Sequence, residues 1–207
     1  MVEILLNQLA FFGELSVNEK ELINAYFSSA KNLVDNCQNR IVKERRTLNY
    51  FNSHYSMMFL YKLARIIYQK EPHINSSDSV NEKLYLLNRM LNAIDLYYKI
   101  DMPDLFLIGH GLGSVFSHAK YSEYFVVYQN VTIGMQDGKY PEIGERVVIY
   151  PNCVVIGDCR IGNNSVIGSG TSLINKSIPD NCVAFEKDGK LTIRENRKNE
   201  IKKYFKL

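Results

Sequence analysis

Hydrophobic residues recur at two different spacings along the 207-residue chain. Up to about residue 100 they fall three or four positions apart, which is the spacing of one face of an amphipathic helix. Such stripes follow Ser16, run from about 53 to 68, and return after Ser79. The motif SVNEK begins at both serines and reads as a capping box, in which the Ser and Glu side chains bond each other's backbone amides. We therefore predict an α-helical N-terminal domain over residues 1–100, with a helix starting at each copy.

Beyond about residue 105 the pattern changes, and between residues 143 and 173 large aliphatic residues return every six positions without a miss. They are Ile143, Ile149, Val155, Ile161, Ile167 and Leu173. Compact residues stand four positions after the first five of these. A period of six fits neither a helix nor a flat sheet, whereas a coil with three short faces takes one hexad for each face. Successive turns of such a coil pair as parallel strands and are stabilised by stacking on their neighbours.

The same phase extends upstream through Val115, Tyr121, Val127 and Ile133. A ten-residue step to Ile143 then interrupts it. The segment GMQDGKYPE at 134–142 therefore leaves the coil as an extruded loop, and loops held by a rigid scaffold are common sites of function. The fold class that we predict is α+β, mainly β. It comprises the helical domain, a parallel β-helix over 101–185 with this loop, and a basic tail over 186–207.

The composition suits a chain with a buried core, because 46% of its residues are hydrophobic. The net charge of +3 is too small to indicate nucleic-acid binding by itself. Glu3 interrupts the apolar start, so we read no signal peptide, and no apolar run is long enough to span a bilayer. We therefore expect a cytoplasmic protein whose four cysteines are reduced thiols. The basic run KERR at 43–46 contains Glu44 and reads as a solvated helix face or loop rather than a binding patch.

These hexads resemble the repeats of the hexapeptide-repeat acyltransferases, which fold as left-handed parallel β-helices. The plan of helical domain, β-helix with one loop, and tail is similar to that of the serine acetyltransferases and of relatives that acetylate sugars. In that family a histidine on an early coil precedes the motif VTLGG, and the coil restarts after the loop at P-x-I-G. Here His110 precedes VTIG (131–134) by 21 residues, and the restart is PEIG at 141–144. The resemblance is strong over about 95–180 and only architectural over the helices.

The resemblance implies an acetyl-CoA-dependent acetyltransferase in which His110 is the catalytic base and Asp95 orients it. Asp101 or Asp104 replaces Asp95 in that role if the register slips, and the plain alternative for Asp95 is a solvent-facing helical carboxylate. A neutral imidazole that removes a proton from an acceptor hydroxyl contributes about 10²–10⁴ in rate. Without its distance from VTIG, His110 would read as a buried histidine bonded to a backbone carbonyl.

In the family, acetyl-CoA lies in a groove between coils of neighbouring subunits, so the resemblance also implies a homotrimer and leaves pairing of two trimers open. The matching cofactor positions are Gly134, Met135, Pro151, Val166, Ser169 and Gly170. The backbone amides of the first two are the implied donors to the oxyanion. Tyr150 stands where the family usually has glycine and is expected to narrow the cleft. The basic tail either meets the phosphates of the cofactor or forms a solvated terminal helix.

The candidate acceptor-binding residues depart from the family pattern. Gly109 stands where serine acetyltransferases have an aspartate, and Lys139 and Tyr140 stand where they have Arg and His. These changes remove a counter-charge for an ammonium group and the bidentate fork that suits a carboxylate. We therefore expect a saccharide acceptor, such as a surface glycan or a sialic-acid-type hydroxyl. His118 has no counterpart in the motif and is either structural or part of the acceptor cleft.

Several alternatives stay open at this point. The acceptor could be L-serine or the amine of an amino-sugar nucleotide, and the coil could be a non-catalytic scaffold. Zinc is the competing chemistry, because gamma-class carbonic anhydrases of this fold bind it with three histidines. Only His110 and His118 fall in the coil, whereas His54 and His73 fall in the helical half. We therefore expect no metal.

Overall fold

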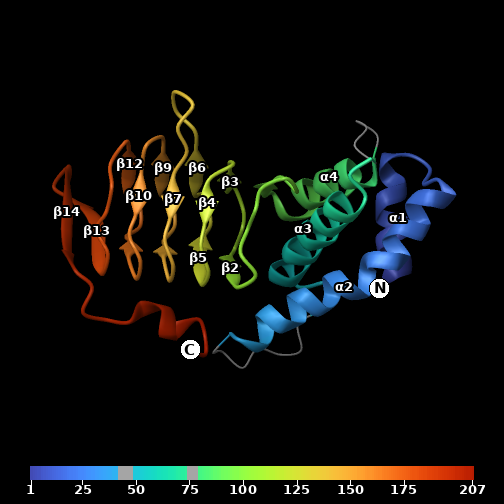
Figure 1. Ribbon diagram of the computed structural model, residues 1–207, viewed down its shortest axis with the longest axis horizontal. Coiled ribbons are helices and arrows are strands. Elements are labelled where there is room, and N and C mark those ends of the chain that lie inside the picture. The colour runs from blue at the N-terminus through green and yellow to red at the C-terminus, as the bar shows by residue number, and fades with distance from the viewer. Residues whose placement is uncertain (42–48, 74–78) are drawn as a thin grey trace.

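The computed structural model describes residues 1–41, 49–73 and 79–207. It places a group of helices beside a ladder of short strands (Figure 1). The basic run at 43–46 lies outside the described residues. Within the described ranges, no helix combines the length and apolar character needed to cross a membrane.

The helical region is organised around one buried helix. Its elements are α1 (Val2–Leu9), the 3-10 helix η1 (Ala10–Phe12), α2 (Val17–Asn39), α3 (Ser53–Lys70) and α4 (Val80–Asn92). The central helix α3 packs against both α2 and α4, and Met58, Phe59, Leu60 and Leu63 on it are fully buried. Because α2 and α4 pack against α3, this helix can hold side chains rigidly against the first strands of the ladder.

The two SVNEK copies behave differently. At the first copy the Ser16 hydroxyl accepts from the Glu19 amide and the Glu19 carboxylate accepts from the Ser16 amide, so the predicted capping box is confirmed. The prediction of a second box is wrong. Among the described residues Ser79 makes no side-chain cap bond, and the Glu82 carboxylate accepts from the hydroxyls of Tyr97 and Tyr98 instead. The Glu82 carboxylate therefore bonds two tyrosines that follow the helix and does not cap its first turn.

The strands form three parallel sheets, which we name by their first strands. The β1 sheet contains β1 (Asp95–Leu96), β3 (Val115–Phe116), β6 (Thr132–Gly134), β9 (Val154–Ile156) and β12 (Ser172–Ile174). The β4 sheet contains β4 (Lys120–Tyr121), β7 (Glu142–Ile143) and β10 (Arg160–Ile161). The β2 sheet contains β2 (Phe106–Gly109), β5 (Phe125–Tyr128), β8 (Val148–Ile149), β11 (Val166–Ile167) and β13 (Cys182–Lys187), with β14 (Lys190–Glu195) antiparallel at its end. From β1 to β13 successive strands along the chain belong to different sheets, so the chain coils, and the predicted β-helix with its helical region is confirmed.

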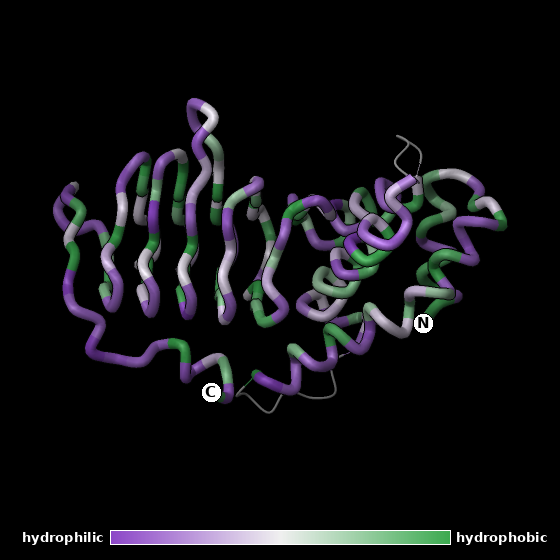
Figure 2. Tube along the Cα trace, in the orientation of Figure 1, coloured by the Kyte–Doolittle hydropathy of each residue, from purple (hydrophilic) through white to green (hydrophobic). Residues whose placement is uncertain are grey.

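The hexad aliphatic residues from Ile143 to Leu173 are all buried in the prism, as predicted. Figure 2 shows the corresponding alternation of hydrophobic and hydrophilic residues along the coils. The upstream phase is wrong at one position. Val115 is 41% exposed, and Phe116 is buried and pairs with Ile133. From Phe116 to Tyr121 the step is five residues instead of six, so this coil is one residue short.

The C-terminal segment crosses the outside of the β2 sheet (Figure 1). After β14 it forms the 3-10 helix η2 (Glu200–Lys203), in which Ile201 is buried, and the Lys206 amide finally donates to the Arg40 carbonyl at the end of α2. Outward-facing residues of the sheet such as Val126 and Val148 are therefore fully buried. The expected alternative of a solvated terminal helix is wrong, because the apolar side chains of this segment pack on the sheet.

Candidate functional site

Strand register aligns several candidate residues along one edge of the prism. Gly109 pairs with Tyr128, Val127 pairs with Ile149, and Ile149 pairs with Ile167. Continuing these registers one or two residues past the strands gives the column His110, Gln129, Pro151 and Ser169. This column runs along the edge between the β2 sheet and the β1 sheet, and we call it the His110 edge. The predicted base and two predicted cofactor positions thus share one edge.

Two further observations mark this edge. His110 has a φ of +56°, in the left-handed region that non-glycine residues seldom adopt, and its side chain reaches solvent. The side-chain oxygen of Gln129 is buried and accepts no hydrogen bond within the described part of the chain. A buried acceptor without a donor is unfavourable, so this position is suited to a donor from outside the chain. The other predicted cofactor positions here are Gly170, next to Ser169, and Val166, which is buried on β11.

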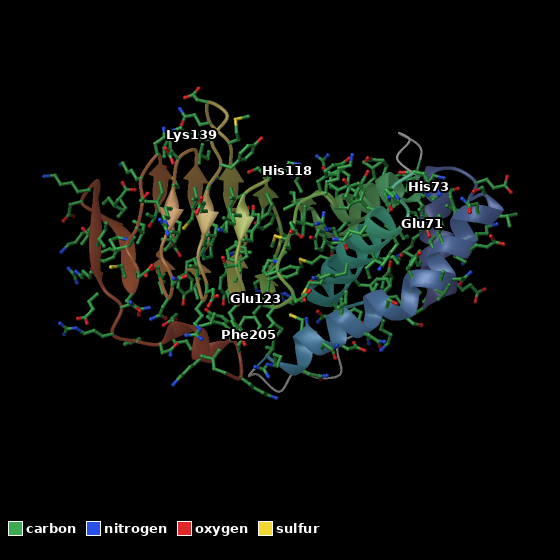
Figure 3. The ribbon with its side chains drawn as sticks, in the orientation of Figure 1. Glu71, His73, His118, Glu123, Lys139 and Phe205 are labelled. Carbon is green, nitrogen blue, oxygen red and sulfur yellow. The ribbon has the colours of Figure 1, made fainter. Side chains whose placement is uncertain are left out.

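The remaining candidates lie on the next edge, between the β1 and β4 sheets. His118 stands in the turn between β3 and β4, and the loop 134–142 leaves the coil between β6 and β7. Figure 3 shows His118 and Lys139 at this end of the coils. We call this the loop edge, and it also carries Gly134 and Met135. The outer face of the β1 sheet separates the two edges, so one chain does not bring all the predicted site residues together.

The extruded loop is a tight hairpin. Gln136 and Lys139 exchange backbone hydrogen bonds of 3.1 and 2.9 Å across Asp137-Gly138. Both turn residues have positive φ, +51° and +74°, which is the geometry that Asp-Gly favours in a two-residue hairpin. The Lys139 ammonium lies 2.5 Å from the Asp158 carboxylate of the following coil, and that hydrogen bond raises the pKa of Lys139. Lys139 is therefore already paired within the chain, whereas Tyr140 is exposed beside it.

Asp95 lies on strand β1 and not on a helix, so the plain alternative of a helical carboxylate is wrong. One oxygen accepts from the Tyr85 hydroxyl at 2.5 Å, and the other lies 3.8 Å from the Arg89 guanidinium. Burial and the bond to Asp95 raise the pKa of Tyr85 to about 12. Within the described residues no hydrogen bond or ion pair joins a carboxylate to His110, so its orientation by Asp95 stays a prediction.

The two alternatives to Asp95 point elsewhere. Asp101 is 85% exposed and pairs with Arg65 at 2.7 Å. Asp104 is 77% exposed and lies 3.3 Å from the buried Lys62 ammonium. Both carboxylates thus tie the start of the coil to α3.

The structure explains the glycine before His110. A Cβ atom at Gly109 would come within 3.0 Å of the Tyr128 ring. Tyr128 stacks on Tyr150 with ring centres 5.5 Å apart, and the hydroxyls of both tyrosines bond the hydroxyl of Tyr204 from the C-terminal segment. Tyr128, Tyr150 and Tyr204 form what we call the tyrosine cluster. An aspartate at position 109 therefore could not fit without movement of this cluster.

The residue that sequence reasoning missed is His54. The Asn52 side chain caps α3, which places His54 in its first turn. Its Nδ1 lies 2.8 Å from the Ile108 carbonyl, and its ring centre lies 5.1 Å from that of His110. No motif or spacing linked these two histidines, because the contact joins the helical region to the first coil across 56 residues of sequence (110 − 54).

Comparisons with known proteins agree with this architecture. Residues 140–175 match the family described as bacterial transferase hexapeptide (six repeats). A serine acetyltransferase of Synechococcus elongatus is 26% identical over 145 residues, which cover 68% of this chain and 57% of that protein. The structure of serine acetyltransferase from Brucella abortus strain S19 matches with a TM-score of 0.72 and 15% identity, covering 94% of this chain and 82% of that one. The chain is thus similar to serine acetyltransferases and carries the hexapeptide repeat over residues 140–175.

A serine acetyltransferase solved in complex with CoA has the same fold, with a TM-score of 0.68 at 15% identity, covering 92% of this chain and 83% of that one. At such identities the structural matches show the fold alone. The chain spans a little over half the length of the curated relatives it matches, 57% and 55% for two of them.

Proposed function

We propose that the chain is an acetyltransferase of the serine acetyltransferase type, which transfers the acetyl group of acetyl-CoA to a hydroxyl group. The observation that carries the proposal is the His110 edge, where the register aligns a solvent-accessible imidazole with Pro151 and Ser169, two of the expected cofactor positions. The similarity to serine acetyltransferases, one of them solved with CoA, supports the same reaction.

In the proposed reaction, His110 accepts the proton of the acceptor hydroxyl as its oxygen attacks the thioester carbonyl. The new C–O bond gives a tetrahedral intermediate whose oxyanion is stabilised by backbone amides, which we assign to Gly134 and Met135. Collapse of the intermediate breaks the C–S bond, and the imidazolium returns its proton to the thiolate of CoA. The products are the acetyl ester and free CoA, and no atom or electron is left unbalanced.

The site that we propose forms between copies of the chain. The predicted base lies on the His110 edge, and the proposed oxyanion donors and the loop lie on the loop edge of the same prism. The face between the two edges carries exposed aliphatic residues, including Val115 and Ile174 at 41% and 47% exposure. Packing this face against a neighbouring copy would remove apolar surface from water and bring one copy's His110 edge to another's loop edge. A homotrimer satisfies this arrangement.

L-serine is the first acceptor to test, because the relatives and the matching structures are serine acetyltransferases. A saccharide is the second candidate, and one observation favours it. Gly109 and the ring of Tyr128 occupy the place where the family has the aspartate, so no carboxylate stands there to pair with an ammonium group. A neutral ring-shaped acceptor does not need that charge.

The experiment is release of the CoA thiol from acetyl-CoA with L-serine, neutral monosaccharides, sialic acids and amino sugars as acceptors. We expect one class of acceptor to raise the rate well above hydrolysis. His110→Ala should lower kcat by about 10²-fold or more while leaving acetyl-CoA binding and the thermal melt unchanged. Absence of acceptor-dependent thiol release, or full activity of His110→Ala, would overturn the proposal.

A further inference from the structure

Helix α3 contacts the turn that carries His110 at two points. At the first point, Nδ1 of His54 lies 2.8 Å from the carbonyl oxygen of Ile108, two residues before His110. At the second point, the turn packs so tightly that a Cβ at Gly111 would come within 2.9 Å of the Met57 sulfur. His54 and Met57 are three residues apart and share one face of α3. The turn is thus fixed by a helix far away in sequence.

The His54 bond also determines which ring nitrogen carries a proton. A carbonyl oxygen can only accept a hydrogen bond, so Nδ1 of His54 must be the protonated nitrogen. A ring held at Nδ1 has its plane fixed relative to the end of β2. That ring meets the His110 ring at a centre-to-centre distance of 5.1 Å and an interplanar angle of 60°. His54 therefore contacts both the backbone before His110 and the imidazole of His110 itself.

We propose that His54 is a positioning residue for His110, which fixes the end of β2 through its Nδ1–H bond and restricts the orientation of the His110 ring. The inference rests on the proposed function, because it assigns a second imidazole to the same site. His110 occupies an exposed turn in a left-handed conformation, and within the described residues it makes no hydrogen bond that would orient its ring. A base displaced by about 1 Å can lose up to about 10²-fold in rate.

Two amides distinguish positioning from simple packing. The side-chain nitrogen of Asn reaches about as far as Nδ1 of His, whereas that of Gln reaches about as far as Nε2. His54→Asn should therefore keep the bond to the Ile108 carbonyl, and His54→Gln should lose it. We expect His54→Asn to retain at least about one third of the wild-type kcat, and His54→Gln and His54→Phe to lose about tenfold or more. The KM for acetyl-CoA should stay unchanged in all three.

The matched control is His73→Phe, which changes an exposed histidine of the same helical region and should leave kcat unchanged. Imidazole NMR of the wild-type protein supplies a readout that does not depend on turnover. We expect a proton on Nδ1 of His54 and a nuclear Overhauser effect between the two rings. Absence of either signal, or equal rates for His54→Asn and His54→Gln, would overturn the role of His54.

The outcomes separate this inference from the proposed function. A wild-type protein that releases no CoA with any acceptor overturns the proposed function and the positioning role together. An active wild-type protein whose His54→Gln variant keeps full kcat overturns the positioning role alone. If His54→Phe does not fold, the Asn and Gln pair and the NMR spectra still decide the question.

Discussion

From Ile143 to Leu173 each coil of the prism repeats the one before it, with an aliphatic residue buried at every sixth position. The junction, by which we mean α3, α4 and residues 94–121, follows no such repeat. There one coil is a residue short, His110 adopts a left-handed conformation, and His54 reaches across from a helix. The regular coils provide stacking and a rigid frame. The junction provides the contacts around His110, the candidate base.

The largest expected effect tests the shifted phase in the first coil. Phe116→Ala removes a buried ring from the prism and should lower the free energy of unfolding by about 3–5 kcal/mol. Val115→Ala removes a 41% exposed side chain and should cost less than about 0.5 kcal/mol as a monomeric effect. Chemical denaturation of the two variants, at a protein concentration where the chain is monomeric, measures the difference. If Val115→Ala lost more unfolding free energy than Phe116→Ala, the shifted phase would be contradicted and the unbroken six-residue phase supported.

The next effect concerns Gly109 and the tyrosine cluster. Gly109→Ala brings a methyl group to within 3.0 Å of the Tyr128 ring, and such overpacking should destabilise the fold by about 1–3 kcal/mol. In the background of Tyr128→Leu the same change should cost markedly less, because the ring has been removed. A double-mutant cycle measured by denaturation gives the coupling between the two positions. Additive losses would show that Tyr128 does not set the size limit at position 109.

A smaller effect compares the two SVNEK copies, of which the first begins α2 and the second begins α4 in the junction. Ser16→Ala removes a cap that is made and should cost about 1 kcal/mol. Ser79→Ala removes a buried hydroxyl that has no partner among the described residues, and its effect should be near zero or slightly stabilising. Thermal or chemical unfolding of both variants measures this, and equal losses at the two serines would contradict the structural difference.

The smallest effect is the pH dependence of stability that arises from an ion pair between the two SVNEK copies. Lys83 lies 2.8 Å from Glu19, with both side chains 13% exposed. Burial raises the pKa of Glu19, but bonds from Lys83 and Ser16 outweigh it and leave the pKa lowered. A lowered folded-state pKa stabilises the fold above the unfolded-state pKa, about 4.3, and this stability is lost as pH falls through the folded-state value.

Unfolding free energies of wild type and Glu19→Gln should therefore differ at pH 7 and converge as the pH falls below about 4. Glu21→Gln, which changes an exposed neighbour, should show no such convergence. A constant difference for Glu19→Gln at all pH values would contradict the linkage.

The same division of the molecule determines what the sequence could predict. The six-residue period predicted the coil, its buried aliphatic residues and the departure of the loop, because each coil packs on its neighbours in the same way. The family motif singled out His110 and the expected cofactor positions, and the strand register places His110 on one edge with Pro151 and Ser169.

The contacts of the junction could not be predicted in this way. No local spacing encodes the packing of segments that are distant in sequence. Such packing brings about the contacts of His54 with His110, of Glu82 with Tyr97 and Tyr98, and of Tyr204 with Tyr128. The single residue missing between Phe116 and Tyr121 is visible in the sequence, but only the pairing of Phe116 with Ile133 shows which residue points inward.

The central claim is that a catalytic site forms where the His110 edge of one copy meets the loop edge of another. The most direct test mixes two folded, poorly active variants, His110→Ala and a variant lacking residues 135–140, under conditions in which subunits exchange. The account predicts that CoA release with the preferred acceptor recovers in the mixture, because some sites combine an intact His110 edge with an intact loop. Absence of recovery, although mass spectrometry shows mixed assemblies, would contradict it.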